Sequence, residues 1–163
     1  MNYKNYFAVA ILLCLGILSL NSCLPKQSDV SSEKPFSDLI HRKLITKTPV
    51  VLAKNPASNP KKYSHIIEDN TGYGIENIEK IADIPAGTEF KIISVQFHTG
   101  RVSGTTSAYI FGTVFIKEHK KEYPFEYTWG DYHVIYEDKP YWKFPLAFWQ
   151  DEALEEKYFI KVP

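Results

Sequence analysis

The chain has 163 residues, and its 19 basic and 19 acidic side chains give a formal net charge of zero. This length suits one domain with a hydrophobic core and is short for two. The balanced charge argues against a nucleic-acid partner, because phosphates require a basic surface.

The first 22 residues have the anatomy of an export signal. Lys4 precedes a run from Phe7 to Leu20 that is apolar apart from Ser19, and small or polar residues follow it. A membrane-spanning helix needs about 20 apolar residues, whereas the apolar region of a signal peptide has about 7 to 15. We therefore expect residues 1–22 to be cleaved from the mature protein.

The next feature is the sequence Leu20-Asn21-Ser22-Cys23, which resembles the lipobox of bacterial lipoproteins. Leu20, Ser22 and Cys23 fit that motif, whereas Asn21 stands where a small or hydroxylated residue is more common. The resemblance implies cleavage just before Cys23 and acylation of its thiol, for example by palmitate. The alternative is an unmodified Cys23 in a soluble periplasmic or secreted protein.

The cysteine content agrees with acylation. Cys14 lies inside the signal, so Cys23 is the only cysteine of the predicted mature chain and no intrachain disulfide can form. An exported protein would otherwise carry an unused thiol. Several acyl chains on one residue make release from a bilayer negligible. Leu24 follows Cys23 where an Asp would favour inner-membrane retention, so the resemblance implies a lipid anchor in the outer membrane of the cell envelope.

Residues 23–35 are predicted to form the lipidated Cys and a polar tether. Leu24 to Pro35 is mixed in charge and has no hydrophobic periodicity. A flexible segment of this length has a root-mean-square span of roughly 18 Å, which would hold the domain near the bilayer. We expect residues 36–163 to form a single β-rich domain.

Within that domain, short apolar runs separated by turn residues predict a mainly β fold, a small barrel or sandwich. The run from Lys120 to Gly130 alternates, so that Tyr123, Phe125, Tyr127 and Trp129 share one face. The run from Tyr109 to Lys117 is rich in β-branched and aromatic residues, and the charged segment Glu118 to Glu122 fits a hairpin turn between the two.

A further strand is predicted from Glu89 to His98, after the turn signal Pro85-Ala86-Gly87. Simple alternation places Ile93, Val95 and Phe97 on one of its faces and Phe90 and Ile92 on the other. Shorter strands are expected at Val50 to Lys54 and at Tyr158 to Val162. One or two short helices are also expected, the candidates being Ser37 to Lys43, Gly74 to Ala82 and Trp149 to Lys157, with a strand as the alternative for Gly74 to Ala82.

The segment Ile81 to Val95 resembles the turn and central strand of bacterial SH3-like domains, in which a Gly-Thr pair follows a diverging turn. The hairpin that follows also fits this family. The resemblance covers about a third of the chain and implies a small SH3-like barrel. The chain after Asp131 has no counterpart in a minimal barrel of that kind, and other small barrels or sandwiches remain the alternative.

No motif of catalysis, metal binding or cofactor binding is present. The five histidines show neither the spacing of a zinc peptidase nor Cys partners for a structural zinc. The chain has no G-x-S-x-G elbow, no S-x-x-K pair and no phosphate-binding loop. We therefore expect a protein that is not an enzyme and that takes no cofactor and no metal.

The region from Tyr123 to Trp149 is dense in aromatic residues. It holds eleven of them, namely Tyr123, Phe125, Tyr127, Trp129, Tyr132, Tyr136, Tyr141, Trp142, Phe144, Phe148 and Trp149. Most are expected in the core, because each buried ring removes about 150 to 250 Å² from water. Tyr132, Tyr141 and Trp142 flank turn signals and are the candidates for exposed, ligand-binding aromatics.

Three functions fit these features. The first is a non-catalytic, membrane-tethered recognition domain of the cell envelope that binds a protein or a cell-wall glycan through loop aromatics. The second is an immunity or inhibitor lipoprotein that blocks an envelope-targeting toxin or hydrolase. The third is a structural subunit of an envelope assembly.

Overall fold

The computed structural model describes residues 26–54, 63–69, 79–100, 105–135 and 137–162 of the chain. These residues form a mainly β fold with a single short 3₁₀ helix, η2, at Phe36–Asp38. The strands are β1 (Lys26–Asp29), β2 (Lys43–Ile45), β3 (Val50–Lys54), β4 (His65–Asp69), β5 (Lys80–Ile84), β6 (Glu89–Thr99), β7 (Thr106–Ile116), β8 (Lys121–Thr128), β9 (Asp131–His133) and β10 (Tyr141–Lys143).

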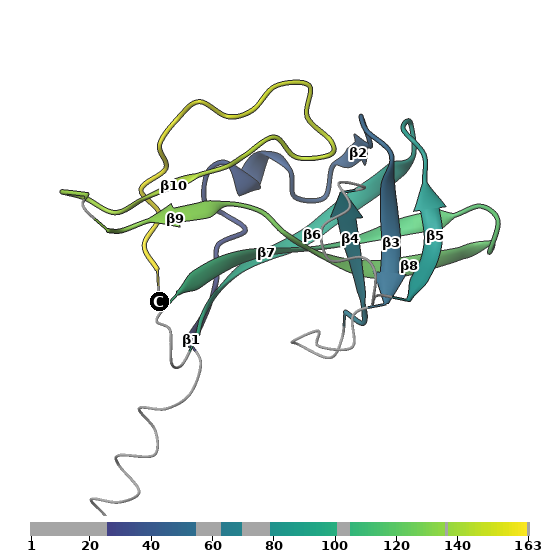
Figure 1. Ribbon diagram of the computed structural model, residues 1–163, viewed down its shortest axis with the longest axis horizontal. Helices are drawn as coiled ribbons and strands as arrows, with labels where there is room; N and C mark the ends of the chain where they lie inside the picture. The colour runs from purple at the N-terminus through teal and green to yellow at the C-terminus, as the bar shows by residue number, and fades with distance from the viewer. Residues whose placement is uncertain (1–25, 55–62, 70–78, 101–104, 136, 163) are drawn as a thin grey trace, which may run out of the picture.

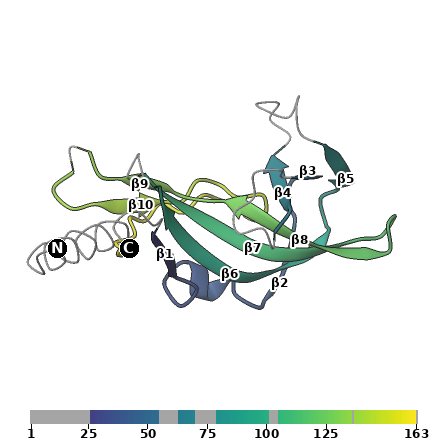
Figure 2. The ribbon, with the colours of Figure 1, turned by 90° about the horizontal axis from the view of Figure 1, so that it is seen from below.

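Eight strands make one sheet in the order β1-β6-β7-β8-β4-β3-β5, with β2 pairing to β6 beyond the end of β1. Its pairs are antiparallel except β4 with β8, which run parallel where Ile66 aligns with Glu126. Figures 1 and 2 show that β6, β7 and β8 form a long twisted ribbon. Strands β3, β4 and β5 lie at one end of this ribbon, and the separate hairpin β9–β10 lies at the other. The prediction of a small, mainly β fold is confirmed, and the sheet is not a closed barrel.

The predicted hairpin of the two aromatic runs is confirmed as β7 and β8. Their register places Val114 opposite Tyr123 and Gly112 opposite Phe125. The alternating face of β8 that carries Tyr123, Phe125 and Tyr127 packs on the hydrophobic core, as predicted.

The side chains of strand β6 do not follow the simple alternation expected from its sequence. Its pairing with β7 shifts register between Ile92 and Ser94, so one residue is inserted as a β-bulge. The bulge turns Phe90, Ile92, Val95 and Phe97 all toward the core, and it leaves Ile93 39% exposed. The opposite strand has Gly112 here, because a Cβ at that position would overlap the Lys91 carbonyl oxygen and the Phe125 ring.

The predicted polar tether is wrong over most of its length. Lys26 to Asp29 form β1 on the edge of the sheet, with Lys26 paired to Thr99. Val30 and Pro35 are buried, and the Val30 N–H donates to the Val95 carbonyl oxygen at 3.0 Å. The polar side chains of this segment do not indicate a strand, because backbone hydrogen bonds hold an edge strand and its faces can expose polar side chains.

Two predicted helices are also corrected. Lys80 to Ala82 belong to β5, which pairs with β3, and the rest of that candidate lies outside the described residues apart from Glu79. The segment Trp149 to Lys157 forms turns and bends without a helix. The helix predicted at Ser37 to Lys43 is reduced to η2. Val50 to Lys54 is strand β3, as predicted, whereas the strand expected at Tyr158 to Val162 is reduced to one bridge between Tyr158 and Trp142.

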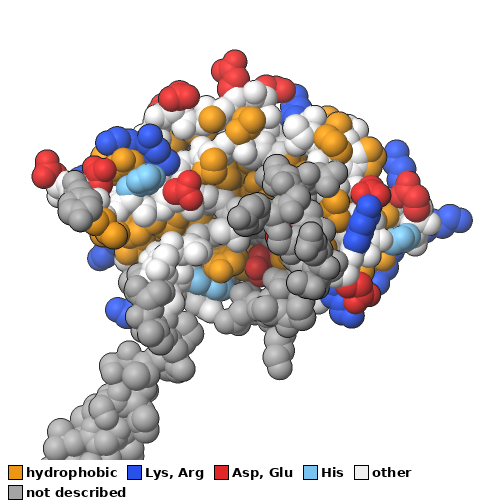
Figure 3. Space-filling view, in the orientation of Figure 1, with side chains coloured by type: hydrophobic (Ala, Val, Ile, Leu, Met, Phe, Trp, Pro, Cys, Tyr) orange, Lys and Arg blue, Asp and Glu red, His pale blue; other side chains and the backbone are white. Residues whose placement is uncertain are grey.

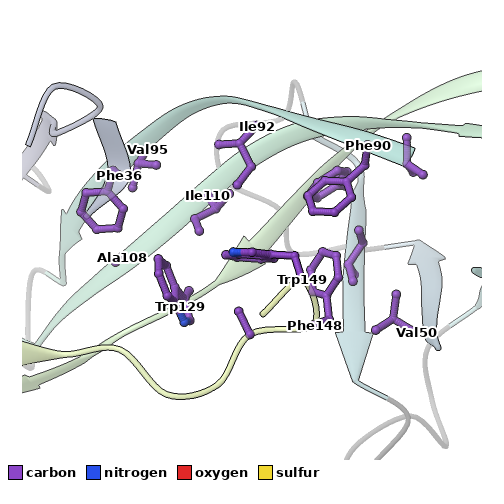
Figure 4. Close-up of a cluster of buried hydrophobic side chains, with 14 of the residues drawn as sticks. Phe36, Val50, Phe90, Ile92, Val95, Ala108, Ile110, Trp129, Phe148 and Trp149 are labelled. Carbon is purple, nitrogen blue, oxygen red and sulfur yellow. The ribbon is translucent and has the colours of Figure 1, made fainter. Parts of the chain in front are cut away.

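Aromatic side chains from irregular segments cover the inner face of the ribbon (Figure 4). Phe36 makes edge-to-face contacts with Phe97, Trp129 and Phe144 at centroid distances of 6.0, 6.1 and 5.2 Å. The Trp129 indole N–H donates to the Pro145 carbonyl oxygen at 2.7 Å. Of the eleven aromatics, the ten described ones are all buried or packed against the core, as expected for most of them, and Tyr136 lies outside the described residues.

Val30 provides a test of the folded N-terminal segment. We expect Val30→Asp to lower the free energy of unfolding by about 2 kcal/mol or more, because it places a carboxylate in the core without a partner. The matched change Ser32→Asp, at an exposed position two residues later, should have little effect. Chemical denaturation measures both. Equal stability of the two variants would mean that this segment is a tether after all.

Candidate functional site

The structure places the aromatic candidates in packed surroundings. Trp142 has no exposed surface and stacks on Phe97 with a centroid distance of 4.2 Å. Tyr141 is 6% exposed, and Tyr132 is half-buried against Trp142. The expectation that these rings are exposed is wrong for Trp142 and Tyr141, because the β9–β10 hairpin folds back on the core instead of standing free. The acylation candidate Cys23 lies outside the described residues.

Tyr141 is enclosed by side chains that are themselves on the surface. The His133 ring stacks on it at 4.9 Å with an interplanar angle of 8°, and the Lys157 ammonium lies 4.0 Å from its centroid. The Tyr141 hydroxyl donates to Glu137 Oε1 at 3.3 Å. In the same loop, the Lys139 ammonium lies 4.4 Å from the centroid of the Phe159 ring. These cation–π contacts hold the hairpin loop against the C-terminal segment.

The described surface has a groove at the other end of the ribbon. Its volume is about 430 Å³, and it lies between the β5–β6 turn and the end of β7. Its apolar lining comes from Ile84, Pro85, Ala86, Phe115 and Ile116. We call it the Phe115 groove.

Phe115 is the exposed aromatic of this groove. It lies on the outward face of β7, opposite Glu122 of β8, and is 50% exposed. It also lines a second hollow of about 210 Å³ together with Lys43 and Lys91. Sequence reasoning placed Phe115 in a strand but missed its exposure, because apolar residues occupy both faces of that strand and the pattern does not indicate which face is covered.

A buried threonine fixes the wall of the Phe115 groove. The Thr46 hydroxyl donates to the Pro85 carbonyl oxygen at 2.8 Å and accepts from the Thr88 N–H at 3.0 Å. The Gly87 N–H donates to the Thr46 carbonyl oxygen at 2.8 Å, with Gly87 at a φ of 87° that favours glycine. These hydrogen bonds hold the turn in one conformation, and a preformed surface of this kind lowers the entropy cost of binding.

The charges around the Phe115 groove are of both signs. Asp83, Glu89 and Glu118 line it, and Lys117 is the one basic residue of the lining. Two of these carboxylates have lysine partners, Asp83 with Lys80 at 2.6 Å and Glu89 with Lys43 at 3.2 Å. Both pairs are exposed and contribute little net energy. The groove thus combines an apolar floor with a rim of balanced charge.

The second face of the ribbon carries one buried carboxyl. Glu126 on β8 aligns with Phe111 of β7 and Ile66 of β4, and it is almost fully buried. Its Oε2 atom has no hydrogen-bond partner among the residues that the structure describes. Desolvation raises the pKa of Glu126 to about 7. Burial also lowers the pKa of His98, which lies against Phe111 on the same face.

Among the described residues, no three His, Cys, Asp or Glu side chains are grouped in a way that could hold a metal ion. The same part of the chain contains no helix long and apolar enough to cross a membrane. No protein-family model matches the chain, and neither a curated protein nor a solved structure is similar enough to match it.

Glu126 makes stability depend on pH in a defined direction. Its folded pKa of about 7 lies above the ordinary value of 4.5, so the folded state keeps a proton that the unfolded chain loses. Stability is therefore lost as pH rises through this window. We expect the stability of Glu126→Gln relative to wild type to increase by up to about 3 kcal/mol across it.

Thermal unfolding at a series of pH values measures this change. Glu122→Gln, an exposed carboxyl on the same strand, is the control and should leave the pH profile as in the wild type. Parallel profiles for Glu126→Gln and wild type would contradict the assignment.

Proposed function

We propose that this protein is a non-catalytic lipoprotein of the bacterial cell envelope, anchored through acylated Cys23, that binds a protein partner in the Phe115 groove. The observation that carries the proposal is the exposed Phe115 in a preformed apolar groove, at the end of the sheet away from the start of the folded chain. The acylation rests on the lipobox-like sequence before Cys23.

The register of the sheet gives the geometry of this arrangement. Thr99 of β6 pairs with Lys26, the first residue of β1, and with Thr106, the first residue of β7. The other end of β7 carries Phe115 and Ile116, which line the groove. The 11 residues of β7 span about 35 Å at about 3.4 Å per residue. An anchor just before Lys26 would therefore present the groove away from the bilayer.

The exposed chemistry favours a protein partner over a glycan. Trp129, Trp142 and Trp149, whose indoles would offer the largest flat surface to a sugar ring, are all buried. A central aromatic with a polar rim is instead the composition of protein interfaces. A rim of both signs suits a segment that places an apolar side chain between polar groups.

Acylation is tested first. Metabolic labelling with palmitate, followed by mass spectrometry of the mature protein, should find the label on wild type, with Cys23 as the N-terminal residue. Cys23→Ser should carry no label. Equal labelling of the two proteins would refute the anchor.

The groove is tested with a photo-crosslinking phenylalanine analogue at position 115 in cells. We expect a discrete protein adduct there and none from the same analogue at Leu146, an equally exposed apolar residue that does not line the groove. The captured protein, once purified, should bind Phe115→Ala at least tenfold more weakly than wild type, because burial of one large apolar side chain is worth about 1.5–3 kcal/mol. Adducts that form equally at both positions, or unchanged affinity, would contradict the proposal.

The identity of the captured protein separates the related functions. An envelope-targeting toxin or hydrolase that loses activity in the complex would make this chain an inhibitor or immunity protein. A stoichiometric envelope component would make it an assembly subunit.

A further inference from the structure

The end of the molecule opposite the Phe115 groove carries exposed apolar side chains. Val134 and Ile135 follow β9 directly, and Ile135 is 73% exposed. Phe159 is 54% exposed and lies beside Tyr141 with a centroid distance of 6.4 Å. We call Val134, Ile135 and Phe159, with the flanking Lys139 and Lys157, the hairpin patch.

The hairpin patch lies at the end of the fold where the described chain begins. Strand β9 packs beside β7. Just before β9, the backbone N–H of Trp129 donates to the Ala108 carbonyl oxygen at 3.0 Å, near the start of β7. The same end of β7 pairs through Thr99 with Lys26. Both views in Figures 1 and 2 place β1, the β9–β10 hairpin and the last described residues together at this end.

The chain between Cys23 and the sheet is short. Lys26 is already paired in β1, so only Leu24 and Pro25 separate it from Cys23. Three residue steps span at most about 10 Å even when fully extended. An acylated Cys23 would hold this end of the domain against the bilayer surface.

We propose that a lipid bilayer covers the hairpin patch, so that Ile135, Val134 and Phe159 contact the boundary between headgroups and acyl chains. This inference rests on the proposed acylation of Cys23. It assigns a second membrane contact that fixes the orientation of the domain, in addition to the acyl chains.

The chemistry of the hairpin patch suits a membrane interface. The ammonium groups of Lys139 and Lys157 lie over the rings of Phe159 and Tyr141, so a positive charge flanks each ring where a headgroup phosphate would lie. Glu137 and Asp138 lie in the same loop, and Figure 3 shows acidic, basic and apolar side chains gathered at this end. Because the charges are mixed, we expect the contact to be insensitive to the content of anionic lipid.

The experiment uses tryptophan quenching by brominated acyl chains. The three native tryptophans are buried in the core, so they contribute a quenching background that is common to every variant. Ile135→Trp is introduced in the acylated protein and reconstituted in zwitterionic vesicles with and without brominated lipid. We expect at least twofold stronger quenching of Ile135→Trp than of wild type. The matched variant Phe115→Trp, at the other end of β7, should match wild type.

The outcomes separate this inference from the proposed function. Mass spectrometry of the same preparation reports acylation directly. If Cys23 is not acylated, the proposed anchor fails, and coupling its thiol to a maleimide lipid supplies an anchor with which the hairpin patch is still tested. If the anchored protein shows equal quenching at both positions, or quenching at 115 alone, the inference is overturned. A loss of quenching that appears only when the protein dimerises on the vesicle would assign the patch to a second copy instead, and would also overturn it.

Discussion

The structure depends on covering one apolar face of a long three-stranded ribbon, and the described residues contain no second large sheet or long helix to cover it. Strands β6, β7 and β8 turn their apolar side chains to one side, and irregular segments around Phe36 and from Phe144 to Trp149 pack over them. Irregular chain leaves backbone groups that need partners, and large rings bury much area for each residue that is ordered. This explains why so many aromatic residues occur in a domain of this size, and why the Trp129 indole N–H is satisfied by the Pro145 carbonyl oxygen.

The same constraint separates the surfaces that matter for binding from those that do not. The aromatic rings that the sequence suggests as ligand-binding candidates, above all Trp142, are buried where they cover the ribbon. The outward face of β7 has no such cover at Phe115, where the strand projects beyond the packed segments. Hydrogen bonds from Thr46 then shape the neighbouring turn into the groove wall. The Phe115 groove lies where the packed segments that cover the ribbon end. The hydrogen bonds that shape its wall all involve the neighbourhood of one buried hydroxyl, that of Thr46.

The sequence predicts the parts of this fold that depend on local pattern. The β7–β8 hairpin and the inward face of β8 follow from alternation and turn chemistry, and both are confirmed. The bulge at Ile93 is not visible in the sequence, because it depends on how β6 registers with β7. Strand β1 is not predicted from the sequence, because its stability comes from pairing with β6 and not from its own side chains. The Phe115 groove is beyond sequence reasoning for the same reason, since exposure is decided by distant segments.

The folded start of the chain changes what an anchor at Cys23 would mean. A long flexible linker lets a domain sample a wide volume, so that it meets partners at many heights above a membrane. A connection of two residues would restrict that volume, and with the hairpin patch also on the bilayer the groove would stand about 35 Å along β7 from the anchored end. The effective concentration of the groove would then be high for partners whose binding segment reaches this height and close to zero for others. Selection by height would act before any contact is made.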